Sequence, residues 1–103
     1  MSPTELSLRE MRKRGYRCQV VEHYHFYAKK RIDLFGIIDI VCIGRGKTVG
    51  LQTTSYSNIS SHRKKIIECE ARRDWIGDGN RILLHGWKKK EGRWILKEEE
   101  FAI

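Results

Sequence analysis

The sequence predicts a single α/β domain over residues 1–103, with a sheet flanked by helices. Two short β-rich runs predict the centre of that sheet. Ile37–Ile43 is apolar at every position except Asp39, and Lys47–Thr54 is again rich in strand-forming residues. Apolar residues at helical spacing occur near the N-terminus and again over residues 59–76. A chain of 103 residues has room for one such domain, which would bury roughly two-thirds of its unfolded surface.

The first element is predicted to be a helix. Ser2 is a suitable N-cap, Pro3 fits the first turn, and Glu5 complements the positive end of the helix dipole. Gly15 ends this helix. Tyr16–Tyr24 then has the composition of a strand.

The segment His25–Ile32 is predicted to be a loop. It combines aromatic side chains with the consecutive cations Lys29, Lys30 and Arg31. Such a mixture is suited to holding phosphate and stacking a base, and it suits an ordinary exposed turn equally well.

The turn Gly44–Lys47 predicts a hairpin between the two β-rich runs. If its centre is Arg45-Gly46, facing residues have numbers that sum to 91, so Asp39 lies opposite Gln52 and Ile37 opposite Thr54. An ionised carboxylate buried in an apolar strand costs several kcal/mol unless a cation or donor compensates it. Asp39 therefore requires a partner.

A second helix is predicted to begin in the hydroxyl-rich segment Ser55–Asn58 and to continue to about residue 76. Two closing strands, Arg81–Trp87 and Arg93–Phe101, follow it. The acidic run Glu98–Glu100 near the end is a candidate for pairing with a basic patch of another subunit.

The charge balance favours a polyanionic partner. The formal net charge is +8 with a pI near 9.7, and the cations occur in separate clusters. A solvated basic surface is the simpler alternative. The three cysteines are widely spaced and predict reduced thiols. Because no membrane span or signal peptide is expected, the sequence predicts a cytoplasmic location, or the host cytoplasm if a phage encodes the chain.

The motifs G-I-I-D at Gly36–Asp39 and L-Q-T-T-S at Leu51–Ser55 resemble those of the PD-(D/E)XK nuclease superfamily. The likeness is to its small Holliday-junction-resolvase-like members in phages and archaea. Asp39 matches the motif's Asp, whereas Gln52 stands at the usual Glu and Thr54 at the usual Lys. The resemblance implies a restriction-endonuclease-like αβββαβ core with a mixed sheet, Mg²⁺-dependent cleavage of DNA, and a homodimer that acts on branched DNA.

The resemblance also implies a site. Asp39, Gln52 and the backbone carbonyl of Thr53 would hold Mg²⁺, or Mn²⁺ in its place, with Thr54 beside the nucleophile. A further carboxylate comes from the first helix in this family, and Glu5 and Glu10 are the candidates for it here. Glu22, at the end of the first strand, is a rival, and Asp33 is either another site carboxylate or a local partner of Arg31. The missing lysine would be replaced from the second helix, by Lys64 or Arg63. Groups placed to contact DNA are Lys29, Lys30, Arg31, His62, Arg63, Lys65, Arg72 and Arg73.

Three functions are compatible with these features. The first is a metal-dependent, structure-selective DNA endonuclease with Asp39, Gln52, Thr54, Glu5, Glu22 and Lys64 as the catalytic candidates. The second is a non-catalytic DNA-binding or junction-binding module on the same fold, favoured by the Gln-x-Thr variant of the motif. The third is a small RNA-binding or protein-interaction protein.

Overall fold

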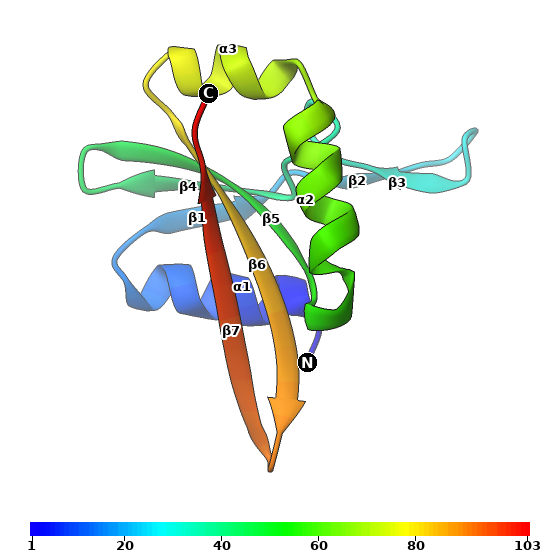
Figure 1. Ribbon diagram of the computed structural model, residues 1–103, viewed down its shortest axis with the longest axis vertical. Coiled ribbons are helices and arrows are strands. Elements are labelled where there is room, and N and C mark those ends of the chain that lie inside the picture. The colour runs from blue at the N-terminus through cyan, green and yellow to red at the C-terminus, as the bar shows by residue number, and fades with distance from the viewer.

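A computed structural model describes residues 1–103 (Figure 1). Its core is a five-stranded mixed sheet with helices on both faces, so the predicted α/β class with a flanked mixed sheet is confirmed. A separate two-stranded hairpin, β2–β3, projects to one side. The elements in chain order are α1 (Pro3–Lys13), β1 (Arg17–Val20), β2 (His23–His25), β3 (Lys30–Ile32), β4 (Ile40–Gly44), β5 (Lys47–Ser55), the 3₁₀ turn η1 (Tyr56–Asn58), α2 (Ile59–Glu68), α3 (Ala71–Gly77), β6 (Arg81–Lys90) and β7 (Arg93–Phe101).

The sheet has the strand order β1-β4-β5-β6-β7, and only β5 and β6 are parallel. The β4–β5 hairpin turns on Arg45 and Gly46, which have φ values of 55° and 74°. Two positive φ values identify the tight primed turn that matches the twist of the strands. This turn pairs Ile40 with Leu51 and Gly44 with Lys47, so the predicted register is confirmed along β4.

The predicted strand Ile37–Ile43 begins only at Ile40. Ile38 pairs instead with Leu34, and the N–H of Ile37 donates to the backbone oxygen of Leu34. Ile37 therefore does not lie opposite Thr54 as predicted.

Alternate side chains of the strands fill two separate cores. On one face Met11 of α1 packs against Ile40 and Leu51. On the other face Ile59 and Ile66 of α2 pack against neighbours from the sheet and the segment before β4, with α3 alongside. Neighbouring strand residues point to opposite faces. Gln52 therefore faces the α2 layer and Thr53 the α1 layer.

The N-terminal helix follows the prediction. The Ser2 hydroxyl accepts a hydrogen bond of 3.2 Å from the backbone N–H of Glu5, and Pro3 occupies the first turn. Gly15, with φ at +100°, ends the helical segment. The cap and the glycine together fix where the chain turns from α1 into β1.

Two further predicted elements are wrong in their limits. The predicted strand Tyr16–Tyr24 is interrupted at Val21 and Glu22, because both of their N–H groups bind the backbone oxygen of Asp39 and draw the chain off the sheet. The predicted loop His25–Ile32 is half strand, since Lys30–Ile32 pairs with His23–His25.

The predicted helix through residue 76 is two helices. Cys69 is extended, with φ −85° and ψ 119°, and its thiol contacts the backbone oxygen of Phe35 at 3.4 Å. After this break α3 packs on the sheet, where the Trp75 indole N–H donates to the backbone oxygen of Arg81 at 2.8 Å. Tertiary contacts therefore decide where α2 ends.

Two further findings concern the cysteines and the helices. Cys18 and Cys42 face each other across β1 and β4 with their sulfur atoms 3.2 Å apart, and all three cysteines are free thiols. None of the helices has the length and apolar character needed to cross a membrane.

Candidate metal centre

Asp39 lies directly before β4, and its side chain is 4% exposed. Its backbone N–H donates to the carbonyl of Leu51, continuing the β4–β5 pairing by one residue. One carboxylate oxygen, Oδ2, accepts hydrogen bonds from Gln52 Nε2 at 2.8 Å and from the backbone N–H of Thr53 at 2.9 Å. The pairing of Asp39 with Gln52 that the register predicted is thus confirmed.

The β2–β3 hairpin brings two more carboxylates to Asp39. Its last pair is His23 with Ile32, so the next residues outward along the two strands are Glu22 and Asp33. One carboxylate oxygen each of Glu22, Asp33 and Asp39 lies within 4.8 Å of the other two. These three residues form the acidic cluster. Of the four outer carboxylates considered from the sequence, Glu22 and Asp33 are the two that lie next to Asp39.

Burial and mutual repulsion set the charge of the acidic cluster. Burial raises the pKa of Asp39 to about 8, and the neighbouring carboxylate of Asp33 adds to the rise. Burial would also raise the pKa of Asp33. The hydrogen bonds from Asp39, Lys65 and Gln52 outweigh burial and hold the pKa of Asp33 below its ordinary value. Without a cation, Asp39 therefore holds a proton at neutral pH and shares it with Asp33.

Two side chains of α2 complete the surroundings of the acidic cluster. Lys65 Nζ lies 2.8 Å from Asp33 Oδ2. His62 is one helical turn earlier, on the same side of α2 as Lys65. Burial, and then the charge of Lys65, lower the pKa of His62, so its imidazole is neutral at pH 7. Its Nδ1 is buried without a hydrogen-bond partner.

The donor set fits a hard divalent cation. Three carboxylates converge, and Mg²⁺ and Mn²⁺ prefer oxygen ligands. The amide oxygen of Gln52 is buried and accepts no hydrogen bond, while the amide nitrogen of the same side chain donates to Asp33 and Asp39. The N–H of Thr53 donates to Asp39, and because the N–H and C=O of a strand residue point to the same side, the Thr53 carbonyl faces the β4 side of β5 as well.

Three predicted catalytic residues have different surroundings. Glu5 lies on α1, across the sheet from α2, and is exposed, whereas Glu10 pairs with Arg14. Lys64 is 75% exposed and lies 4.0 Å from Glu68, so Lys65 and not Lys64 reaches the acidic cluster. Thr54 is buried two residues after Gln52 on the same face of β5.

The predicted DNA-binding cations divide into two groups. Lys29, Lys30 and Arg31 are exposed on the β2–β3 hairpin, and Arg31 lies 3.6 Å from Glu22 at its base. Arg63 forms a two-point ion pair with Glu99, and Arg72 donates to the backbone oxygens of Ile67 and Ala102. These two arginines already have partners within the chain. Arg73 is exposed on α3.

The acidic run near the C-terminus also has internal partners. Glu98 pairs with Arg14, Glu99 with Arg63, and Glu100 with Arg81. The sequence predicted a partner in another subunit for this run; within the chain it pairs with cations at the end of α1, in α2 and in β6.

A second buried polar network lies on the α1 face and was not predicted. His85 Nδ1 contacts the Ser7 hydroxyl at 2.9 Å, and His85 Nε2 contacts Glu98 at 2.7 Å. A serine, a histidine and a carboxylate in series are the components of a nucleophilic relay. Ser7 and His85 are both fully buried, and the Trp87 indole N–H occupies the Ser7 oxygen at 2.9 Å. This network therefore joins α1 to the sheet and has no access to a substrate.

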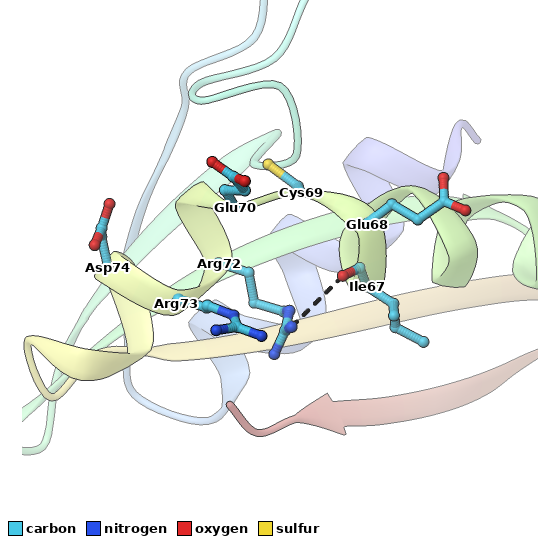
Figure 2. Close-up of a pocket in the computed structure, with 7 residues that line it drawn as sticks. All are labelled: Ile67, Glu68, Cys69, Glu70, Arg72, Arg73 and Asp74. Carbon is cyan, nitrogen blue, oxygen red and sulfur yellow. Dashed lines mark hydrogen bonds between the residues drawn. The ribbon is translucent and has the colours of Figure 1, made fainter.

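A hollow of about 460 Å³ lies where α2 meets α3 (Figure 2). The carboxylates of Glu70 and Asp74 and the guanidinium groups of Arg72 and Arg73 project to opposite sides of the helix in this view. The hollow has no member of the acidic cluster in its wall and no converging set of like ligands. The three carboxylates that do lie close together are those of the acidic cluster, elsewhere in the molecule.

Comparison of the chain with protein-family models, with curated proteins and with solved structures finds no match. The residues and their geometry are accordingly the basis for assigning a function.

Proposed function

We propose that this protein is a divalent-metal-dependent DNA endonuclease that selects branched DNA, in the manner of the resolvase-like nucleases that its motifs resemble. The convergence of Glu22, Asp33 and Asp39 beside a basic hairpin carries the proposal. When all three are ionised, carboxylates whose oxygens lie within 4.8 Å of one another repel each other strongly. A bound cation would relieve that repulsion and draw a phosphate to the same place.

Each residue of the site has a role that follows from its position. Glu22, Asp33 and Asp39 would bind Mg²⁺ or Mn²⁺, with oxygens of Gln52 and Thr53 as neutral ligands. When bound, such an ion supplies Lewis acidity and lowers the pKa of a ligated water. The Asp39 carboxyl must lose its proton before it can bind a cation, so metal binding is favoured as the pH approaches about 8.

Lys65 takes the part that the resemblance gives to the lysine of the motif. Its side chain is 44% exposed, and its ammonium group contacts the acidic cluster through Asp33. It can therefore turn toward a phosphate and balance the negative charge that develops during cleavage. The neutral His62 on the same side of α2 can accept a proton. Thr54 supplies a hydroxyl but no charge.

A second candidate function is metal-free binding of branched DNA. The observation in its favour is that the acidic cluster is internally satisfied. Asp39 holds a proton, and Lys65 and Gln52 both donate to Asp33. A site of this kind would serve as a structural element, and the basic hairpin would then bind DNA without cutting it.

The resemblance also implies a homodimer, and we propose that two copies act together on a branch. β7 is an edge strand of nine residues whose outer side is free to pair. Sedimentation equilibrium, with and without a four-way junction, measures this directly. A strictly monomeric protein in both conditions would exclude a dimer.

The decisive experiment is cleavage of an end-labelled four-way DNA junction in Mg²⁺, Mn²⁺ or EDTA. Wild-type protein and Asp74→Asn, which alters an exposed carboxylate on α3, are expected to nick the junction when a cation is present. Asp39→Asn is expected to bind the junction and to cut it at least about 100-fold more slowly, since a catalytic metal contributes several kcal/mol. Equal cutting by Asp39→Asn and wild type would refute the nuclease. Salt-sensitive junction binding without nicking by any of the three proteins would support the second candidate.

A further inference from the structure

The β2–β3 hairpin carries a cluster of exposed aromatic side chains. Tyr24, Phe26 and Tyr27 are 59%, 78% and 89% exposed. Phe26 and Tyr27 lie in the loop that joins the two strands, with their ring centroids 5.7 Å apart in an edge-to-face arrangement. Single exposed apolar residues are ordinary on a protein surface, but three aromatics within four residues at the end of a projecting hairpin indicate a binding surface.

The charge of the hairpin indicates what binds there. Residues 23–32 contain no acidic side chain, and Lys29, Lys30 and Arg31 are all exposed. The hairpin projects beyond the main sheet and is paired with no strand of it (Figure 1). Aromatic faces next to cations are the combination by which proteins bind unpaired nucleotides, with the bases on the rings and the phosphates on the cations.

The base of the hairpin is the acidic cluster. Glu22 directly precedes β2, and Asp33 directly follows β3. About four residues separate Glu22 from Phe26, which at the rise of a strand is roughly 13 Å, or about four base steps of a DNA strand. A nucleotide stacked at the tip therefore places the backbone a few steps away next to the acidic cluster.

We propose that the tip of the β2–β3 hairpin is a stacking platform for unpaired bases, so that the substrate is DNA in which strands separate, such as a fork, a flap or an open branch point. This inference rests on the proposed action on DNA and narrows its substrate class. Intact duplex hides the faces of its bases, and only bases that have left the stack can cover Phe26 and Tyr27. Each base stacked on an aromatic ring contributes about 1–3 kcal/mol.

An anionic lipid surface is the other partner that attracts aromatic and basic residues together. The acidic cluster at the base of the hairpin favours DNA, because only a nucleic-acid strand that runs from the tip to the base would bring a phosphate to a metal-dependent site there. An unpaired strand can stack its bases on the aromatics, place its phosphates on the cations and bring its backbone to the acidic cluster, where a metal-dependent site would cut it.

The test is equilibrium binding of fluorescent oligonucleotides in EDTA, where no cleavage interferes. The probes are a single strand, a fork and a blunt duplex, and the proteins are wild type, the double variant Phe26→Ala/Tyr27→Ala, the aromatic rescue Phe26→Trp/Tyr27→Trp, and Trp94→Ala. Trp94 is an exposed aromatic on β7 and serves as the control. Loss of two stacked bases predicts that the double alanine variant binds single strand and fork at least about tenfold more weakly. We expect it to bind duplex within about twofold of wild type, because duplex contacts are mainly to phosphate.

The rescue variant is expected to regain the preference for unpaired DNA, and Trp94→Ala to keep it. Unchanged fork binding by the double alanine variant would overturn the proposal, and so would an equal loss for fork and duplex. Binding to phosphatidylserine vesicles that depends on Phe26 and Tyr27, with no such dependence for DNA, would overturn it in favour of a membrane. If the junction is cut but the double alanine variant keeps the wild-type preference for fork over duplex, the stacking platform is refuted and the nuclease proposal is not. If the preference for fork over duplex depends on Phe26 and Tyr27 but no nicking occurs, the stacking platform is supported and the nuclease proposal is refuted.

Discussion

Gln52 donates a hydrogen bond of 2.8 Å to Asp39 across the β4–β5 pairing, and the same amide nitrogen donates to Asp33 at 3.1 Å. A glutamate at position 52 could not make either contact in its ionised form. The amide thus stabilises two neighbouring carboxyl groups in the absence of a cation. In exchange, the site has one negative charge fewer than it would have with glutamate at position 52. This relationship makes the state of the acidic cluster adjustable by pH, by metal and by single substitutions.

The first prediction concerns Asp39→Asn in the absence of metal. The pKa of Asp39 is about 8 in the fold, against 3.8 for the ordinary carboxyl, so between these values the folded protein holds a proton that the unfolded chain has lost. The free energy of unfolding of the wild type therefore decreases as the pH rises from about 4 to 8. Asparagine imitates the protonated acid, so Asp39→Asn should flatten this decrease.

Urea unfolding in EDTA at pH 6 and pH 8 measures the effect. At pH 8 the variant is expected to be more stable than wild type by about 1–2 kcal/mol. An identical dependence on pH in both proteins would show that Asp39 is ionised throughout.

The second prediction concerns Gln52→Glu, which restores the usual acid of the motif. A fourth carboxylate should lower the free energy of unfolding in EDTA by about 1–3 kcal/mol, since Asp39 loses a donor and gains a repelling charge. The same substitution should tighten Mn²⁺ binding. Gln19→Glu, on the exposed side of β1, is the matched control and should leave both quantities nearly unchanged. Calorimetric titration measures the Mn²⁺ affinity of each protein. Weaker Mn²⁺ binding by Gln52→Glu would contradict the assignment of Gln52 as a ligand.

The third prediction separates two adjacent lysines. Lys65→Gln should slow junction cleavage by about 10²–10³-fold, as loss of a charge-stabilising donor does in other hydrolytic sites. Lys64→Gln changes an exposed side chain whose nearest acid is Glu68, so cleavage should be nearly unaffected. Thermal denaturation of both variants controls for folding. Equal loss of cleavage in the two variants would indicate general DNA binding instead of a specific role for Lys65.

The fourth prediction concerns Glu98 and acid stability. Its hydrogen bond from His85, with further help from Arg14, lowers the pKa of Glu98 to about 2 from an ordinary 4.5. The unfolded chain takes up a proton first as the pH falls, so stability is lost between about pH 4.5 and pH 2. Glu98→Gln should weaken this acid sensitivity, whereas Glu70→Gln at an exposed position should not. Acid titration followed by circular dichroism decides between them.

The parts of the fold that sequence reasoning predicted are those fixed by local chemistry. Ser2 and Pro3 fix the start of α1, and the primed turn at Arg45-Gly46 fixes the β4–β5 register. That register alone brings Asp39 to Gln52. It follows from a short turn that contains Gly46 and from a side-chain period of two, both of which a sequence displays directly.

The rest of the site depends on contacts that a sequence does not display. The β2–β3 loop contains no glycine, and its residue with positive φ is Lys29, at 53°. The sequence therefore has no turn signal that predicts the hairpin between Glu22 and Asp33. The choice between Lys64 and Lys65 depends on a helix rotation of about 100° per residue. The helical periodicity of the sequence predicted that the helix continues past Cys69. In the structure α2 ends there, where the Cys69 thiol contacts the backbone of Phe35.

The most direct test of the metal centre is a titration of Mn²⁺ at pH 8 followed by electron paramagnetic resonance, with wild type and Asp39→Asn side by side. At this pH the Asp39 carboxyl is about half ionised even without metal, and a cation would favour its ionised form. The predicted result is saturable Mn²⁺ binding by wild type that Asp39→Asn loses, with Asp74→Asn behaving as wild type. Equal Mn²⁺ binding by wild type and Asp39→Asn would contradict the account, because the ion would then be held somewhere other than at Glu22, Asp33 and Asp39.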